Sequence, residues 1–202
     1  MLQFVYSSIQ TEKHKCYYGH MKNINFKNTL EIIVFGGGCF WCLEPIFSQI
    51  KGVHETAVGY AGGQIANPTY EEVYDGKTGH AEVVCVVFNP KEVSFKAWLE
   101  VFFTFHDPTT VNRQGNDIGE QYRSIIFITK VYQAKIITDY ITEIQPKFKN
   151  PIVTEIKALE QFYPAEDYHQ NYFLSNKNAP YCQIAITPKI TKFRQIFKKI
   201  AK

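Results

Sequence analysis

The sequence predicts an α+β fold in a single domain, and three observations lead to this prediction. Stretches with strand character and stretches with helical spacing follow one another in the order β-α-β-β-α-β-α-β. This order differs both from the strict alternation of a parallel sheet and from an all-β protein. The chain has 202 residues, 45% of them hydrophobic, which is enough to bury one core. We therefore expect a two-layer α+β sandwich, in which helices pack on a mixed or antiparallel sheet.

The first half of the chain is predicted to contain three strands and two helices. Residues 30–37, "LEIIVFGG", are apolar and β-branched and end in glycine, which indicates a buried strand. Apolar residues then recur at helical spacing from 40 to 50, and a second strand begins after Gly52. Residues 67–80 contain Pro68, Gly76 and Gly79 and are predicted to be loop and turn. Residues 81–90 form a central strand covered on both faces, and residues 94–107 form a helix capped by Ser94.

The second half begins with a polar stretch, 108–121, that is predicted to be irregular. A strand over 122–129, a helix that stops at Pro146 and a strand over 152–159 follow it. Residues 188–202 are a basic amphipathic helix, for which docking on the protein body is favoured over binding to a membrane. The complete order predicts a two-layer α/β sandwich, a ferredoxin-like plait, with a long irregular C-terminal segment.

The charge distribution argues against nucleic acid as the main partner. Residues 187–202 carry six Lys or Arg and no acid, whereas residues 31–186 carry 12 Lys or Arg against 18 Asp or Glu. The body of the protein is therefore acidic, and phosphate binding requires a basic face.

Five cysteines, an odd number, do not suggest a secreted disulfide framework. No apolar run approaches the roughly 20 residues of a membrane span. We therefore expect a cytoplasmic protein with no membrane association. Residues 1–30 are predicted to be an N-terminal tail in which Cys16 is incidental and Met21 is a second candidate start, and residues 31–202 to be one catalytic domain.

The segment "GGGCFWC" (36–42) carries the strongest chemical signal. Cys39 lies where a helix is predicted to start, and the N–H groups of a helix N-terminus stabilise an anion. A thiol there can ionise near neutral pH, and the glycines before it let a substrate approach the backbone. The alternative is a buried structural thiol on a tight turn, and the cysteine alone does not decide between them.

Cys42 completes a C-x-x-C pair with two standard meanings. Zinc needs four ligands, and neither a second C-x-x-C pair nor paired histidines are present, so no metal is expected. A redox role is favoured, since a neighbouring thiol can condense with an oxidised Cys39. Phe40-Trp41 stands between the cysteines, where a thioredoxin-like reductase normally has Gly-Pro.

Glu82 and the polar segment 112–124 are two further candidate features. Glu82 is followed by an apolar strand, so burial is expected to raise the pKa of its carboxyl and keep it protonated, unless the side chain reaches solvent. Segment 112–124, "NRQGNDIGEQYRS", is either a surface loop or a loop that supplies hydrogen-bonding groups to a catalytic centre.

Seven stretches together resemble the methionine sulfoxide reductase A family. They are "GGGCFWCLEPIF", "VGYAGG", "NPTYEEV", "TGHAEVV", "HDPTT", "RQGNDIGEQYRS" and "PYCQIAITPK". The resemblance runs from about residue 32 to 197. It implies an oxidoreductase that repairs oxidative damage by reducing the S epimer of methionine sulfoxide, free or in peptides, without a bound cofactor. Thioredoxin is implied as the external reductant and a monomer as the assembly.

The resemblance also implies a role for each matching residue. Cys39 corresponds to the nucleophile, which passes through a sulfenic acid and an intramolecular disulfide, and Phe40 and Trp41 to the pocket for the substrate methyl group. Glu82 corresponds to the acid that protonates the sulfoxide oxygen. The remaining members of the predicted site are Tyr70 and Tyr122, which donate to the same oxygen, and Asp117, which organises the polar cluster.

The resolving thiol is the point at which this sequence departs from the commonest family pattern. Many members have glycine where Cys42 stands, and members that resolve from the C-terminal segment have a cysteine where Cys182 stands. Cys182 is favoured because it follows a proline in a stretch predicted to be a loop that can reach the site. Cys42 is the competing resolver or a relay, and Cys85, inside an apolar strand, is expected to be an inert core thiol.

Two alternatives belong to other functional classes. A hydrolase would pair Cys39 with a histidine base, for which His80, His106 and His169 are available, but no pattern links one of them to Cys39. A non-catalytic, redox-regulated module would use the aromatic pocket to hold methionine-containing peptides. One set of assays distinguishes the three functions. Reduction of a methyl sulfoxide with dithiothreitol indicates the reductase, ester hydrolysis indicates the hydrolase, and peptide binding without either reaction indicates the module.

Overall fold

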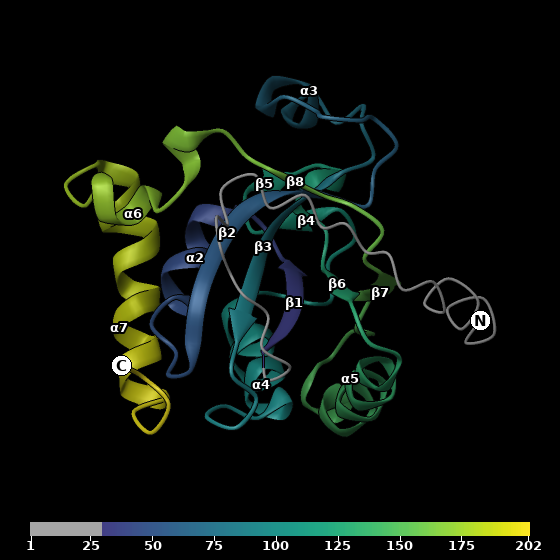
Figure 1. The fold of residues 1–202 in the computed structure, drawn as a ribbon, viewed down its shortest axis with the longest axis vertical. Coiled ribbons are helices and arrows are strands. Elements are labelled where there is room, and N and C mark those ends of the chain that lie inside the picture. Colours follow the sequence, from purple (N-terminus) through teal and green to yellow (C-terminus); the bar gives the residue numbers. More distant parts are fainter. Residues whose placement is uncertain (1–29) are drawn as a thin grey trace.

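A computed structural model describes residues 30–202 as a six-stranded sheet with helices packed against it (Figure 1). The other residues of the predicted tail, 1–29, which include Cys16 and Met21, lie outside the described residues. The sheet consists of β1 (Glu31–Gly36), β2 (Val53–Ala61), β3 (Ala81–Phe88), β6 (Ile125–Ile128), β7 (Glu155–Ala158) and β8 (Phe162–Pro164). Their order is β7-β6-β1-β3-β2-β8, with β6 and β7 parallel and the other pairs antiparallel. The predicted combination of helices with a mixed sheet is confirmed.

The helices connect these strands and cover the sheet. The α-helices are α2 (Phe40–Phe47), α3 (Tyr70–Tyr74), α4 (Phe95–Phe105), α5 (Val131–Ile144), α6 (Tyr172–Ser175) and α7 (Thr187–Ile196). Three 3₁₀ turns, η1 (Glu120–Tyr122), η2 (Gln145–Lys147) and η3 (Asp167–His169), and a π-helical turn, η4 (Cys182–Ile186), complete the connections. As predicted, Ser94 caps α4, because its hydroxyl accepts the N–H of Ala97.

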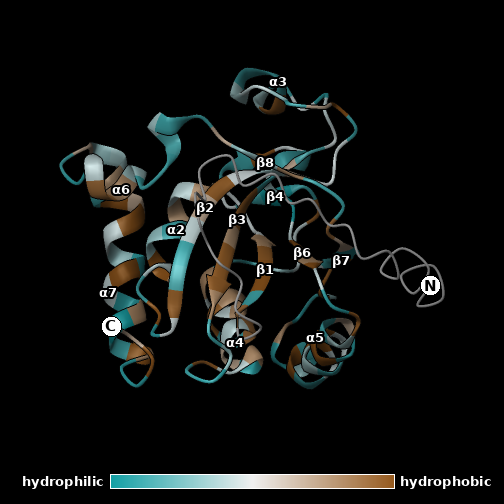
Figure 2. Cartoon of the chain, in the orientation of Figure 1, coloured by the Kyte–Doolittle hydropathy of each residue, from teal (hydrophilic) through white to brown (hydrophobic). Residues whose placement is uncertain are grey.

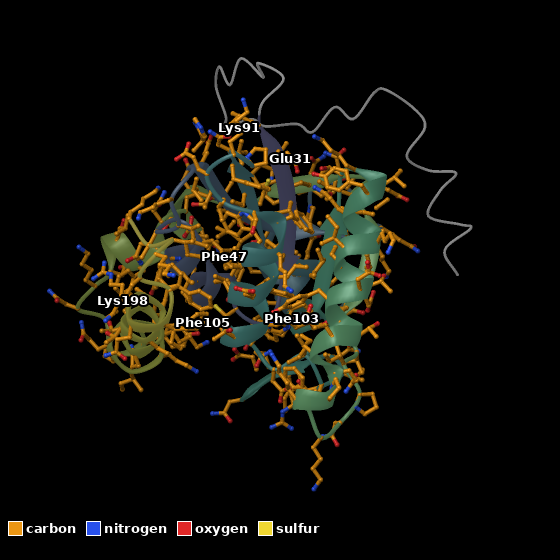
Figure 3. All side chains as sticks on the ribbon, turned by 90° about the horizontal axis from the view of Figure 1, so that it is seen from below. Glu31, Phe47, Lys91, Phe103, Phe105 and Lys198 are labelled. Carbon is orange, nitrogen blue, oxygen red and sulfur yellow. The ribbon has the colours of Figure 1, made fainter. Side chains whose placement is uncertain are left out.

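Strand β3 lies at the centre of the core, as its continuous apolar sequence predicted. Every residue from Ala81 to Phe88 is buried, and successive side chains enter two different apolar clusters. One cluster joins the sheet to α2, α4 and α5, and the other includes Leu159 and Phe162. Figure 2 shows β1 and β3 as hydrophobic ribbons at the centre of the molecule. Figure 3 shows Phe47, Phe103 and Phe105 inside the molecule among the ribbons.

Three parts of the chain are more ordered than predicted. Segment 67–80, expected to be loop and turn, contains the short helix α3, whose start is fixed by a reciprocal pair of hydrogen bonds between Thr69 and Glu72. The polar segment contains a hairpin of two short strands, β4 (Arg113–Gln114) and β5 (Asp117–Ile118). Cys182 begins the π-helical turn η4, so the expectation of a loop there is wrong.

The C-terminal helix packs on the protein body, as the favoured interpretation expected. Helix α7 contacts α2, and Phe193 has no exposed surface and meets the edge of Phe105 with ring centroids 6.2 Å apart. Ile196, the last residue of the same helix, is 54% exposed. Within the part of the chain that the structure describes, no helix has the length and apolar character needed to cross a membrane.

Candidate active site

Cys39 is the residue that immediately precedes helix α2, at the C-terminal end of the glycine run. Gly38 adopts a φ of +90°, which side-chain-bearing residues rarely adopt, and a Cβ there would lie 2.6 Å from Gln114 Cγ. A Cβ at Gly36 would lie 2.8 Å from Ile125 Cγ2. These glycines therefore allow a tight turn and close packing against other parts of the protein, whereas we had expected them to admit a substrate.

A cavity of about 140 Å³ opens beside Cys39. Its lining combines a thiol, three tyrosine rings, two further aromatic side chains and two carboxyl groups. The structure thus brings together seven residues that were predicted as site residues, and adds Tyr181. The lining residues are Cys39, Phe40, Trp41, Tyr70, Glu82, Asp117, Tyr122 and Tyr181.

Glu82 is buried beneath the start of helix α2. It is only 2% exposed, so the alternative of a carboxylate that reaches solvent does not apply. Its Oε2 atom accepts the backbone N–H of Phe40 at 3.1 Å. Burial, reinforced by the charge of Asp117, raises the pKa of Glu82 to about 8, although the Phe40 N–H acts in the opposite direction. As predicted, this group is an acid that keeps its proton near pH 7.

Tyr70 and Tyr122 bring two phenol groups to the same cavity. Tyr70 is the first residue of α3, and Tyr122 is the last residue of η1. Burial, together with the nearby charges of Glu82 and Cys39, raises the pKa of Tyr70 to about 12 and raises that of Tyr122 further. Both hydroxyls therefore remain protonated and can donate hydrogen bonds into the cavity.

The two thiols of the C-x-x-C pair share a hydrogen bond, and this changes which of them ionises. The bond to Cys42 is the main cause that raises the pKa of Cys39 well above its usual value, followed by burial and the charge of Glu82. The same bond is the main cause that lowers the pKa of Cys42 to about 6, against the effect of burial; Lys189 and Tyr181 lower it further. In the resting protein these directions favour the thiolate on Cys42, whereas the position of Cys39 at the helix start predicted it on Cys39. The first backbone N–H group of α2, that of Phe40, donates to the Glu82 carboxyl group. The Glu82 carboxyl group is therefore bound at the helix N-terminus, where the sequence predicted the Cys39 thiolate.

Cys182 is placed beside Cys42, and it does not line the cavity. It has no exposed surface and belongs to an apolar cluster with Cys42, Ile186 and Ile190. Cys42 therefore interacts with Cys39 and shares an apolar cluster with Cys182. Cys85 is fully buried in β3, as predicted for a core thiol inside an apolar strand.

The indole of Trp41 is held in place by residues that sequence reasoning did not assign to the site. Its ring stacks on Tyr172 with a centroid separation of 3.8 Å and an interplanar angle of 9°. Its Nε1–H donates to Nδ1 of the buried His169 at 3.1 Å. The segment "DYHQNY" that carries both residues follows the strands of the sheet, so only its tertiary placement reveals this contact.

The three histidines considered as hydrolase bases make other hydrogen bonds. His80 contacts the Gly63 N–H and the Ile65 carbonyl, and His169 receives the Trp41 indole N–H. His106 contacts the Phe102 carbonyl and Ser124 Oγ, both at 2.7 Å, and burial lowers its pKa to about 4. These contacts support the interpretation of the histidines as packing and hydrogen-bonding residues. Among residues 30–202, no group of three His, Cys, Asp or Glu side chains is arranged to hold a metal ion.

Comparisons with known proteins agree with this geometry. The family model described as peptide methionine sulfoxide reductase matches residues 31–201. A relative named peptide methionine sulfoxide reductase MsrA, from Polynucleobacter asymbioticus, is 50% identical over 89% of this chain and 97% of its own. The crystal structure of reduced Mxr1 from Saccharomyces cerevisiae superposes with a TM-score of 0.73 at 35% identity, over 77% of this chain and 91% of that one. The structure of Mxr1 in complex with Trx2 matches with a TM-score of 0.53 at 28% identity, over 71% of this chain and 86% of that one.

Proposed function

Since the chain belongs to the peptide methionine sulfoxide reductase family, we propose that the cavity beside Cys39 is where it reduces methionine-S-sulfoxide to methionine. The protein is an oxidoreductase of protein repair under oxidative stress. One observation supports the assignment of the site above all: the thiol of Cys39 and the protonated carboxyl of Glu82 line one small cavity together with two phenol donors and an aromatic wall.

The chemical step uses both the apolar wall and the hydrogen-bond donors of this cavity. Phe40 and Trp41 hold the methyl group, and the sulfoxide oxygen accepts hydrogen bonds from Tyr70, Tyr122 and Glu82. Cys39 becomes the nucleophile when its shared proton moves to Cys42, and its thiolate attacks the sulfoxide sulfur. Glu82 gives its proton to the oxygen, because negative charge develops there. The oxygen ends on Cys39 as a sulfenic acid, and methionine leaves with its sulfur reduced.

The role of Asp117 is to set the electrostatics of this polar cluster. It lines the cavity, and its charge helps to raise the pKa of Glu82. Burial also raises the pKa of Asp117. We assign Asp117 to positioning and electrostatics and leave proton donation to Glu82.

Resolution of the sulfenic acid involves the other two site cysteines. Sequence reasoning favoured Cys182 as the first partner of Cys39, and that remains a prediction. The contacts support a different order, in which Cys42 attacks first because its thiol already touches that of Cys39. The new disulfide releases the sulfenic oxygen as water. Cys182, which belongs to the same apolar cluster as Cys42, then exchanges into a Cys42–Cys182 disulfide and frees Cys39.

Thioredoxin is the reductant we propose for the final disulfide, and the structure of Mxr1 in complex with Trx2 supports this choice. We also propose a monomer without a bound cofactor, in the cytoplasm, with residues 31–202 as one catalytic domain. The match of the family model to 31–201 supports the domain. The ferredoxin-like plait remains a prediction, supported by the order β6-β1-β3-β2 of four antiparallel strands.

The deciding experiment is reduction of separated R and S epimers of methionine sulfoxide with dithiothreitol. We expect methionine from the S epimer only, and its absence would exclude the proposed reaction. Peptide mapping after one equivalent of the S epimer identifies the disulfide. A Cys39–Cys182 bond as the first product, before any bond that contains Cys42, would contradict the order proposed above.

A further inference from the structure

A groove of about 480 Å³ adjoins the substrate cavity and gives access to Cys42. The groove and the cavity share Cys39, Asp117 and Tyr181. Cys42 and Lys189 line only the groove. The second thiol of the C-x-x-C pair therefore faces a different compartment from the sulfoxide, and that compartment contains a cation.

Lys189 differs from the other basic side chains of the C-terminal segment. It lies near the start of α7, is half-buried and lines the same groove as Cys42, and its charge lowers the pKa of that thiol. Lys192 is exposed and lies over the Phe105 ring at 5.7 Å, and the exposed Arg194 donates to Gln49. Lys198 is also exposed and lies at the margin of the molecule in Figure 3. Lys189 thus lines the groove together with Cys42, whereas Lys192, Arg194 and Lys198 do not.

We propose that Lys189 is a positioning residue that holds its ammonium group beside the Cys42 sulfur and so activates Cys42 to attack the oxidised Cys39. This inference deepens the proposed function and rests on it. It also assigns a role to the basic C-terminal helix, which the sequence left without one.

The surroundings of Cys42 favour a thiolate at this position. Tyr181 places its hydroxyl 3.4 Å from Cys42 Sγ, and the thiol of Cys39 forms a further hydrogen bond. Cys182 belongs to the same apolar cluster as Cys42, and the nearby acid Glu82 is protonated near pH 7. Lys189 also acts on the pKa of Asp117 and of His106, which face the same groove.

The activated step is balanced within the protein. The Cys42 thiolate attacks the sulfur of the Cys39 sulfenic acid, an S–S bond forms, and the S–O bond breaks. Hydroxide leaves and takes up a proton from the solvent to become water. Cys39 is reduced from the sulfenic to the disulfide level, and Cys42 supplies the electrons, so no further reactant is needed.

The test measures thiolate formation and the lifetime of the sulfenic acid separately. Full-length chains carry Cys182→Ser, so that Cys182 cannot replace Cys42, with or without Lys189→Met. Thiolate absorbance is followed against pH, and a single turnover with methionine-S-sulfoxide is quenched with dimedone. Lys189→Met should move the thiolate midpoint up from about 6, by roughly one to three pH units for loss of a neighbouring charge. One equivalent of methionine should still form, and the dimedone adduct of Cys39 should rise several-fold.

Two further variants make the result specific. Lys189→Arg keeps the charge and should restore both readouts, and Lys198→Met removes an exposed cation from the same segment and should match the parent. An unchanged midpoint without dimedone adduct in Lys189→Met would overturn the proposal. Slower methionine formation below the raised midpoint is expected, because the thiol pair must lose one proton first. Failure of Lys189→Met alone to form methionine above that midpoint would overturn the proposal, because it would place Lys189 in the first step. Absence of methionine from the parent chain would instead refute the proposed function.

Discussion

At the scale of single residues, the division of labour between Cys39 and Glu82 can be tested directly. Cys39→Ser should abolish turnover, because a hydroxyl replaces the attacking sulfur. Glu82→Gln should slow the chemical step by about 10²–10⁴-fold, the usual contribution of a positioned proton donor. Its amide still fits beside the Phe40 N–H, so substrate affinity should change little. Rapid-quench measurement of methionine at saturating substrate checks this, and a native rate in Glu82→Gln would remove Glu82 from the mechanism.

The titrating groups of the site predict a bell-shaped dependence of the chemical step on pH. The Cys39–Cys42 pair must lose one proton, which occurs as the pH rises through about 6. Glu82 must keep its proton, which it loses as the pH rises through about 8. The rate should therefore fall below the first value and above the second. Single-turnover rates measured from about pH 5 to about pH 9.5, a range that brackets both groups, check this prediction. The Glu82→Gln variant should lose the alkaline limb.

The sequence predicted which residues meet at the site far better than it predicted their protonation. Cys39 could be named from the predicted helix start and Glu82 from its apolar strand, whereas the two tyrosines could be named only because their motifs resemble those of the family. The proton distribution between Cys39 and Cys42 could not be predicted, because it depends on the bond between the two thiols and on burial, and also on Lys189 and Tyr181. Lys189 and Tyr181 follow the thiols by more than 130 positions along the chain. Tyr181, whose hydroxyl contacts Cys42, follows it by 139 positions.

At the scale of secondary-structure elements, helix α3 positions Tyr70, one of the two phenol donors. Tyr70 is its first residue, and the preceding Thr69 accepts the N–H of Glu72 while the Glu72 carboxylate accepts the N–H of Thr69. Thr69→Ala should cost about 1 kcal/mol of local helix stability. We expect a lower kcat from a less fixed Tyr70, with unchanged thiol titration. Steady-state kinetics with Thr69→Ser as the matched control test this, since serine keeps the cap; equal losses in both variants would contradict it.

The missed elements are short ones whose stability comes from tertiary contacts. Helix α3 has five residues inside a Pro- and Gly-containing stretch, although the T-x-x-E spacing at Thr69 and Glu72 was a usable signal. Strand β8 has three residues and is held by its pairing with β2. By contrast, β1, β3 and α4 carry long apolar patterns of a single period, and these were predicted from the sequence.

At the scale of the whole molecule, the C-terminal segment closes the fold over the helix that carries the cysteines. Helix α7 contacts α2, Ala201 pairs with Ile50, and Lys202 donates to the carbonyl of Ser48. The last residues of the chain thus bind the turn that directly follows α2, as the two neighbouring ribbons in Figure 1 illustrate. Stability of the body and placement of Lys189 beside Cys42 are therefore coupled through one docked helix.

Phe193 and Ile196 offer a matched pair of side chains on this helix with which to measure the docking. Phe193 has no exposed surface and meets Phe105, whereas Ile196 is 54% exposed. Phe193→Ala should lower the free energy of unfolding by about 3–5 kcal/mol, because it leaves a cavity between α7 and α4. Ile196→Ala should stay within about 0.5 kcal/mol of the native value. Denaturant titration followed by both tryptophan fluorescence and circular dichroism gives these values. If α7 docks as one cooperative unit with the sheet, the two probes will give the same midpoint in Phe193→Ala; separate midpoints would show that the helix can detach while the body stays folded.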